Sequence, residues 1–242
     1  MMAFATIIKK RGIEMKRKVI KVMDRTSGFD GVIEGESNTI ALAAAKRVAT
    51  GPVDDGLNPL GLVGQSGTGK TRILNAIAAE IASLQDGRTV ISITGQQFRS
   101  DYVNALTNDY VPSFRDKFKM ADVLLVEGAE VFEASACLAD EILPIIDDFL
   151  KNGKQVVIAL TRPFKKSKEI NRSFYGRIVS SATLSLAYPD EDMKRRYIKS
   201  YLSMKDATLP DSKIKSILKS SAKSFWEIKG AVCTALYENV AG

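Results

Sequence analysis

The sequence of 242 residues contains no histidine and only two cysteines. Without histidine, the chain has no Ser-His-Asp or Cys-His nucleophile pair and no histidine ligand for a metal ion. Cys137 and Cys233 match no metal-ligand spacing, and we interpret both as reduced thiols of a cytosolic protein. Any catalysis must therefore use carboxylates, Lys, Arg, Ser and Thr.

Long apolar runs are also absent. No run approaches the ~20 residues that a membrane-spanning helix needs. An apolar stretch opens the chain and basic residues follow it, which reverses the order found in a secretory signal. We therefore expect a cytoplasmic protein with no membrane partner. The content of 45% hydrophobic and 26% charged residues is typical of a globular protein.

Charge is distributed unevenly along the chain, which has a formal net charge of +7. Residues 1–28 carry eight basic and two acidic side chains, and residues 162–177 carry six basic and one acidic. Between them, residues 120–150 carry eight acidic side chains and no basic one. Such blocks serve contacts with a polyanion or between subunits, but many are only solvated surface.

Short apolar runs alternate with helical patterns from residue 57 onward. The runs predict buried strands of a parallel sheet at residues 60–63, 89–94, 123–126, 156–160 and 183–186. Apolar residues at helical spacing predict helices at 70–84, 98–108, 112–119 and 134–151. This order is typical of an α/β fold with helices covering the sheet. After Pro189, three further helical patterns predict a small helical domain.

A phosphate-binding loop follows the first strand. Residues 64–71 read Gly-Gln-Ser-Gly-Thr-Gly-Lys-Thr, a complete G-x-x-x-x-G-K-T motif between a buried strand and an amphipathic helix. Its glycines let backbone N–H groups point at phosphates, Lys70 supplies a positive charge, and the Thr71 hydroxyl can ligate Mg²⁺. The sequence thus predicts a site for ATP or ADP with Mg²⁺. The predicted contact residues here are Gly64, Gln65, Ser66, Gly67, Thr68, Gly69, Lys70, Thr71 and Arg72.

The acidic residues that hydrolysis needs are incomplete. The strand at 123–126 is followed by Glu127, which can reach Mg²⁺, and by Gly128, which cannot act as a base. Loss of a positioned general base lowers the rate by about 10²- to 10⁴-fold. We interpret Glu130, a little further on, as an exposed acid at a helix start and not as a replacement.

These motifs resemble the AAA+ ATPase module of the bacterial chromosomal replication initiator family, DnaA. The resemblance extends to Phe29-Asp30, to residues 35–38, to the segments 97–106 and 114–118, and to Arg162-Pro163. It implies an α/β, three-layer αβα AAA+ P-loop fold over residues 28–188 and a small helical lid over residues 189–242. A basic tail of residues 1–27 precedes them.

The resemblance also implies roles for single residues. Val32, Ile33 and Asn38 fall where the family encloses the adenine, and Thr161 takes the position of the first sensor. Arg177 aligns with the arginine finger that a neighbouring subunit supplies, which makes a head-to-tail assembly chemically sensible. The implied catalytic set is Lys70, Glu127, Thr161 and Arg177, with Thr71 and Glu127 at the metal ion.

The segment 97–118 is similar to the family's insertion that meets single-stranded DNA. It offers the basic residues Arg99, Arg115, Lys117 and Lys119, with Tyr102 and Phe114 for stacking on bases. Residues at these spacings are more often half core and half solvated surface.

The sequence departs from the family in three places. Glu127 and Gly128 stand where the family has paired aspartates, and Trp226 stands where it has a second-sensor arginine. We expect Trp226 to pack the lid against the core. We also expect the family's C-terminal DNA-binding domain to be absent.

The first hypothesis is a DnaA-like protein of replication initiation or its control, with weak or absent ATP hydrolysis. It assembles head to tail with itself or with a full-length initiator, and it contacts single-stranded DNA. The alternative is a helicase loader or phage-type replication accessory ATPase, whose N-terminal segment binds a replicative helicase. A third reading is a non-catalytic, nucleotide-bound assembly partner without DNA contact.

Overall fold

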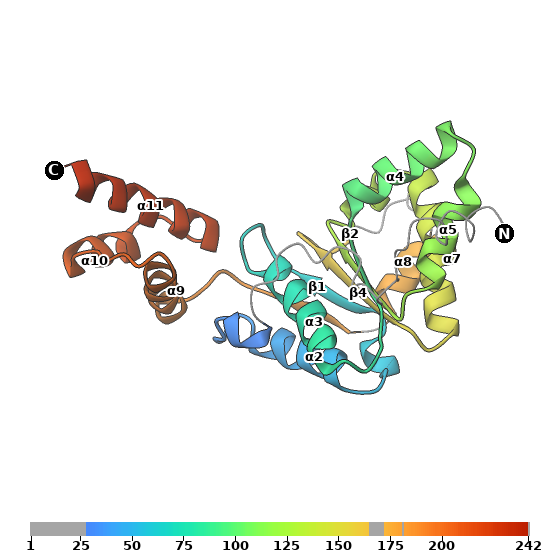
Figure 1. Cartoon of the computed structure of the whole chain (residues 1–242), viewed down its shortest axis with the longest axis horizontal. Helices are drawn as coiled ribbons and strands as arrows, with labels where there is room; N and C mark the ends of the chain where they lie inside the picture. Colours follow the sequence, from blue (N-terminus) through green and yellow to red (C-terminus); the bar gives the residue numbers. More distant parts are fainter. Residues whose placement is uncertain (1–27, 165–171, 181, 242) are drawn as a thin grey trace, which may run out of the picture.

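A computed structural model describes residues 28–164, 172–180 and 182–241 (Figure 1). Its centre is a parallel sheet of five strands in the order β2-β3-β4-β1-β5. The strands are β1 (Leu60–Val63), β2 (Val90–Thr94), β3 (Val123–Glu127), β4 (Gln155–Leu160) and β5 (Thr183–Ser185). The predicted α/β fold with a parallel sheet between two layers of helices is confirmed.

Side chains of the central strands alternate between the two faces of the sheet. In β3, Leu124 and Val126 belong to the core on one face, whereas Val123 and Leu125 belong to the core on the other. The first face is covered by α4 (Gly95–Thr107), α5 (Val111–Lys119), α6 (Glu130–Glu133), α7 (Ala136–Lys151) and α8 (Arg172–Val179). The second is covered by α2 (Thr39–Thr50) and α3 (Lys70–Leu84). Burial on both faces explains why these strands read as continuous apolar runs.

Two short 3-10 helices, η1 (Phe29–Gly31) and η2 (Asp55–Leu57), flank α2 along the chain. η1 leads into residues 32–38, which pass beside the start of α3, since Arg72 Nε donates a hydrogen bond to Gly31 O at 3.2 Å. The beginning of the described chain is thereby placed next to the phosphate-binding loop.

Helices α9 (Glu191–Met204), α10 (Asp211–Lys219) and α11 (Phe225–Ala241), which we call the lid, pack around an apolar cluster of their own. Figure 1 shows them at one end of the molecule, beyond β1 and α3, with the α4, α5 and α7 layer at the other end. The Arg196 guanidinium on α9 donates a hydrogen bond to Glu34 O at 2.6 Å. The lid therefore contacts the segment that runs past the phosphate-binding loop.

The elements differ from the sequence-based expectations mainly at their ends. α4 begins at Gly95 because Thr94 caps it: its hydroxyl accepts a hydrogen bond from Gln97 N at 3.0 Å. The helix predicted at 134–151 begins at Ala136, capped by Ser135, and a separate short helix, α6, precedes it. α8 lies in a segment that the sequence indicated only as basic. Among the described residues, no helix is long and apolar enough to cross a membrane.

Candidate nucleotide-binding site

The loop of residues 64–71, called the P-loop below, joins β1 to α3. Gly67 and Gly69 have φ angles of +77° and +103°, in the left-handed region that favours glycine. At Gly64, a Cβ atom would lie 2.5 Å from Leu186 O, so a side chain does not fit there. Because Gly69 is also the N-cap of α3, the loop delivers its backbone N–H groups to a helix N-terminus, where an anion is stabilised.

Lys70 is buried at the base of the P-loop. Its ammonium group donates hydrogen bonds to Gly64 O at 2.5 Å and to Gln65 O at 2.9 Å. Burial lowers the pKa of Lys70, while the carboxylates of Glu130 and Glu127 act in the opposite direction. The lysine is thus held at the loop by backbone carbonyls, and the acids that favour its charged form lie at the end of β3 and just after it.

Thr71 and Glu127 meet at the edge of the sheet. The Thr71 hydroxyl, in the first turn of α3, donates a hydrogen bond to Glu127 Oε1 at the end of β3. A hydroxyl and a carboxylate are the hard oxygen ligands that Mg²⁺ prefers. These two predicted metal-binding residues therefore fit a magnesium ion, although they are 56 positions apart in the chain.

A pocket with a volume of about 750 Å³ opens over the P-loop. Of the predicted site residues, it is lined by Val32, Ile33, Asn38, Ser66, Gly67, Gly69, Lys70, Thr71, Arg72, Glu127 and Thr161. Three predicted contact residues do not line the pocket but shape the loop, namely Gly64, Gln65 and Thr68. The carbonyl groups of Gly64 and Gln65 accept the hydrogen bonds from Lys70. Thr68 Oγ1 donates a hydrogen bond to Gln65 O at 2.9 Å. The structure brings the predicted nucleotide contacts and metal ligands to one cavity.

Asn38 supports the wall predicted to enclose the adenine. Its amide nitrogen donates to Ile33 O at 2.9 Å, and its amide oxygen accepts from Gly35 N at 2.9 Å. The side chain is buried, so its polar atoms are used to fold the loop that carries Val32 and Ile33 to the pocket.

The lid provides the opposite wall, with Tyr197, Phe225, Trp226 and Lys229. Trp226 is 71% exposed, so the expectation that it packs the lid against the core is wrong. Sequence reasoning missed Tyr197, Phe225 and Lys229, as well as Asn75 on α3. The spacing of Trp226 and Lys229, three residues apart on a helix, was a usable signal because such residues share a face.

The lid touches the P-loop directly. Phe225 N donates a hydrogen bond to Gly67 O at 3.0 Å, and a Cβ atom on Gly67 would lie 2.6 Å from Ser224 Cβ. Ser224 and Glu227 form a capping box at the start of α11, with Glu227 Oε2 accepting from Ser224 N at 2.7 Å. Hydrogen bonds from the backbone N–H groups of Ser224 and Lys223 lower the pKa of Glu227. The capped N-terminus of α11 is therefore in direct contact with Gly67 of the P-loop.

At the other side of the pocket floor, Glu130 Oε1 accepts a hydrogen bond from the backbone N–H of Thr161. Glu130 stands at a helix start as interpreted, but its side chain is half-buried and its carboxylate turns to the end of β4. Thr161, the predicted first sensor, lies in the pocket wall beside Gly128.

The chain matches the family model of the bacterial DnaA ATPase domain over residues 23–184. It belongs to this family. The DnaA protein of Chlorobaculum tepidum is 26% identical over 208 residues, which are 86% of this chain and 42% of that protein. The chain thus spans less than half the length of this relative.

Solved structures of DnaA proteins share the fold. Domain III of the Thermotoga maritima replication initiation protein DnaA superposes with a TM-score of 0.81 at 25% identity, covering 89% of this chain and 90% of that one. A replication initiator DnaA bound to AMPPCP and single-stranded DNA superposes with a TM-score of 0.74 at 23% identity, covering 86% and 63%. The three-layer architecture and the lid are therefore those of DnaA domain III.

Arg177, the predicted arginine finger, does not line the pocket of its own chain. It lies on α8, where its Nε is 2.6 Å from Asp147 Oδ1 on α7, and it is 46% exposed. A finger acts on a neighbouring subunit, so the role that the DnaA resemblance implies for Arg177 stays a prediction.

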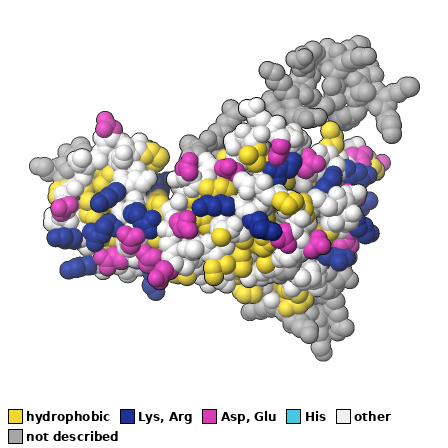
Figure 2. Space-filling view, turned by 90° about the horizontal axis from the view of Figure 1, so that it is seen from below, with side chains coloured by type: hydrophobic (Ala, Val, Ile, Leu, Met, Phe, Trp, Pro, Cys, Tyr) yellow, Lys and Arg dark blue, Asp and Glu magenta, His cyan; other side chains and the backbone are white. Residues whose placement is uncertain are grey.

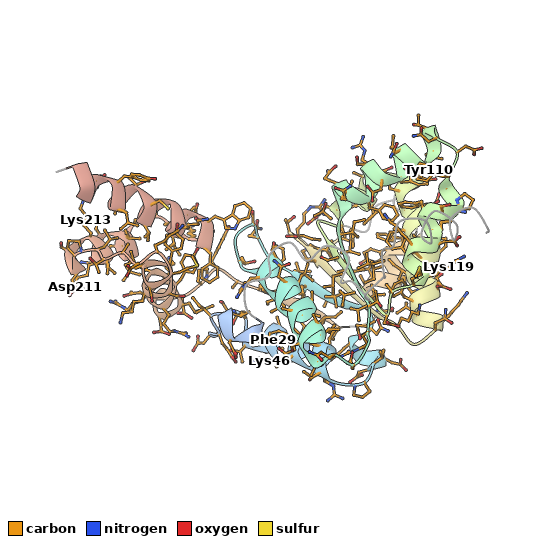
Figure 3. The ribbon with its side chains drawn as sticks, in the orientation of Figure 1. Phe29, Lys46, Tyr110, Lys119, Asp211 and Lys213 are labelled. Carbon is orange, nitrogen blue, oxygen red and sulfur yellow. The ribbon has the colours of Figure 1, made fainter. Side chains whose placement is uncertain are left out.

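The DnaA-like insertion forms α4 and α5; Figure 3 labels Tyr110 in the connection between them and Lys119 at the last residue of α5. Tyr102 and Phe114 are only 8% and 3% exposed, so the expectation that they stack on bases is wrong. They belong instead to the aromatic core around Phe98, whose ring centroid is 5.2 Å from that of Phe114.

Most basic side chains of this insertion pair with acids. Arg115 binds Glu141 at 2.6 Å, Lys117 binds Asp101 at 2.7 Å and Lys119 binds Asp116 at 2.8 Å. Arg99 is exposed. Figure 2 shows acidic and basic side chains interspersed over the face in view. The predicted basic tail, residues 1–27, and Lys165, Lys166 and Lys168 lie outside the described residues.

Proposed function

We propose that this chain binds ATP or ADP with Mg²⁺ and acts in DNA replication initiation or its control, with slow ATP hydrolysis. The observation that carries the proposal is the pocket in which Lys70, Thr71 and Glu127 meet beneath the lid. The DnaA protein of known structure that was bound to AMPPCP supports an adenine nucleotide as the ligand.

Each part of the pocket has a task in binding. The backbone N–H groups of the P-loop and the N-terminus of α3 hold the phosphates, and Lys70 exchanges its contacts to Gly64 O and Gln65 O for phosphate oxygens. Thr71 and Glu127 would hold Mg²⁺, which when bound neutralises charge on the phosphate oxygens. The loop at Val32 and Ile33 and the aromatic residues of the lid enclose the base and sugar.

Two departures from the family support slow hydrolysis. Gly128 offers no carboxylate at the position of the second acid, and a positioned base is worth about 10²- to 10⁴-fold in rate. Trp226 replaces the arginine expected from the lid, which removes one positive charge from the phosphate end of the pocket. The residues that bind the nucleotide are complete, whereas those that act on its γ-phosphate are reduced.

The proposed partners are a neighbouring subunit and single-stranded DNA. The exposed Arg177 suits a head-to-tail assembly, with a second copy or with a full-length initiator, in which it reaches the neighbour's nucleotide. Single-stranded DNA as a partner is supported by the DnaA complex of known structure, which holds it. On α4 and α5, Arg99 is the residue we propose for a phosphate contact, because Arg115, Lys117 and Lys119 are ion-paired.

The test is isothermal titration with ATP, ADP and GTP, with and without Mg²⁺. Tight, magnesium-dependent binding of adenine nucleotides supports the proposal, and its absence overturns it. Turnover is measured beside binding. Hydrolysis at the rates of ordinary AAA+ enzymes, abolished in Lys70→Ala, would refute the proposal of slow hydrolysis.

Partner assays separate the remaining alternatives. Removal of residues 1–27 that abolishes binding to a replicative helicase favours the helicase-loader reading. If the same deletion only weakens salt-sensitive DNA binding, the segment is an electrostatic arm. Absence of single-strand binding at ~50 mM salt, where phosphate contacts are strong, favours an assembly partner without DNA contact.

A further inference from the structure

The chain turns sharply where it leaves β3. Gly128 has a φ angle of +66°, a left-handed conformation that residues with a side chain rarely adopt. The N–H groups of Gly128 and Ala129 both donate to Ala159 O, at 3.0 and 3.3 Å. This turn carries the chain across the end of β4 instead of away from the sheet.

The turn determines where the next acid lies. α6 begins at Glu130, and one oxygen of the Glu130 carboxylate accepts a hydrogen bond from Thr161 N. The other oxygen, Oε2, lies 3.8 Å from the position that a Cβ atom on Gly128 would take. The carboxylate of residue 130 thus occupies the space beside residue 128, between two residues of the pocket wall, Gly128 and Thr161.

Glu130 also acts electrostatically on the lysine of the P-loop. Both Glu130 and Glu127 act on the ammonium group of Lys70, and Glu130 has the larger effect. Glu127 is in contact with the Thr71 hydroxyl, so it belongs to the metal-binding pair. Glu130 has no contact with Thr71 among those of the described residues, and its hydrogen bond goes to a backbone N–H group instead.

We propose that Glu130 is the general base of the slow ATP hydrolysis, in the place that Gly128 leaves without a side chain. This rests on the proposed function of the pocket. The Glu130 carboxylate orients a water molecule, whose oxygen forms a bond to the γ-phosphorus. The bond from that phosphorus to the bridging oxygen breaks, and ADP leaves with this oxygen and the electron pair. The proton from water passes to Glu130 and then to solvent.

The geometry also explains why the reaction stays slow. Glu130 reaches the strand end from the first residue of a helix of four residues, and Thr161 N engages one of its two oxygens. One acceptor site of the carboxylate is taken by this hydrogen bond, and a base held from a short helix is less precisely positioned for the water than one fixed directly at a strand end.

The test combines three variants, Glu130→Gln, Glu130→Asp and Glu133→Gln, in the full chain. Glutamine keeps an oxygen for the Thr161 N–H but cannot take a proton, and aspartate keeps the charge on a shorter side chain. Glu133 lies on the same helix and forms an ion pair with Arg162 at 2.6 Å, so Glu133→Gln makes the same chemical change at a matched site.

Nucleotide affinity is read from the fluorescence of Trp226, the single tryptophan of the chain, which lines the pocket. Hydrolysis is followed in single-turnover experiments with Mg²⁺-ATP. We expect Glu130→Gln to bind ATP within about twofold of wild type and to hydrolyse it about 10²-fold more slowly. Glu130→Asp retains part of the rate, and Glu133→Gln hydrolyses ATP like the wild type.

A pH profile separates catalysis from support of the loop. Protonation removes a base, so the wild-type rate falls at acidic pH, and Glu130→Gln lacks this decline in its residual rate. Wild-type turnover in Glu130→Gln overturns the inference. So does a wild-type protein that binds ATP without hydrolysing it, which leaves the proposed binding function intact. Failure of the wild type to bind ATP at all overturns the proposed function and, with it, this inference.

Discussion

The floor of the nucleotide pocket has two halves, the P-loop and the ends of β3 and β4, and they differ in how closely they follow a sequence motif. The P-loop half follows its motif residue by residue, and the glycines within the motif determine its shape. The half at the ends of β3 and β4 has a glycine at residue 128, where the DnaA resemblance implies an acid, and Glu130 returns to the strand end from a short helix. Under the proposed function, binding and hydrolysis rest on separate parts of the chain, so that one can weaken while the other stays intact.

The largest effect should come from the P-loop half. Replacing Lys70 with alanine removes the one ammonium group buried in that loop, and we expect the affinity for ATP to fall about 100-fold, as for other buried charge contacts. Isothermal titration measures the loss. Lys46→Ala, at an exposed lysine paired with Glu34, is the control and should bind normally. If Lys70→Ala lowers the affinity for ATP by less than threefold, the P-loop half is not the part of the pocket that determines binding.

The next largest effect should be on the binding of Mg²⁺, whose two proposed ligands come from the two halves of the pocket floor. In Glu127→Ala the Thr71 hydroxyl loses its carboxylate partner, and we expect the affinity for Mg²⁺ in the ATP complex to fall at least about tenfold. Titration of Mg²⁺ into the protein–ATP mixture measures it. ATP binding without Mg²⁺ should stay near the wild-type value, because the P-loop is untouched. Equal losses with and without Mg²⁺ would contradict a metal-binding role.

A smaller effect is expected at the turn after β3. Gly128→Ala and Gly153→Ala both place a side chain at positive φ, +66° and +62°, so each should lower the free energy of unfolding by roughly 1–2 kcal/mol. Urea denaturation measures this cost. Only Gly128→Ala should also slow ATP hydrolysis, by about tenfold, since only this turn positions Glu130. If both variants hydrolyse ATP equally fast, the turn has no part in the reaction.

The smallest effect is expected from the lid. Ser224→Ala removes the hydroxyl that caps α11, which should lower the free energy of unfolding by about 1 kcal/mol. ATP affinity should change by less than about threefold, because the bond from Phe225 N to Gly67 O is made by the backbone. Ser135→Ala removes the corresponding cap of α7, which does not line the pocket, and is the matched control in thermal melts. A large loss of ATP affinity in Ser224→Ala alone would assign the serine a direct role in binding.

Much of the fold was predictable because its signals are local. The strands buried on both faces are continuous apolar runs, and the P-loop is eight consecutive residues, so the sheet and the phosphate site could be predicted from the sequence. α8 was not predicted, although Phe174 and Ile178 stand four residues apart at helical spacing, because the helix is only eight residues long and contains Gly176.

The second half of the pocket depends on contacts between distant residues. The bond between Glu130 and Thr161 spans 31 positions, and that between Thr71 and Glu127 spans 56. The direction of the Glu130 side chain follows from the φ angle of Gly128, which a sequence motif does not specify. Tyr102 and Phe114 were offered for stacking on bases because the segment is similar to the DnaA insertion, whereas packing against Phe98 buries them.

The hydrogen bond from Phe225 N to Gly67 O ties the lid to the loop that holds the phosphates. A nucleotide that reshapes the P-loop also acts on this bond, and so does any molecule that moves the lid. Thermodynamic linkage then requires the two effects to be equal: a partner that changes the affinity for nucleotide by some factor has its own affinity changed by nucleotide by that same factor. Through this one backbone contact, a partner that binds the lid can respond to the nucleotide bound at the P-loop.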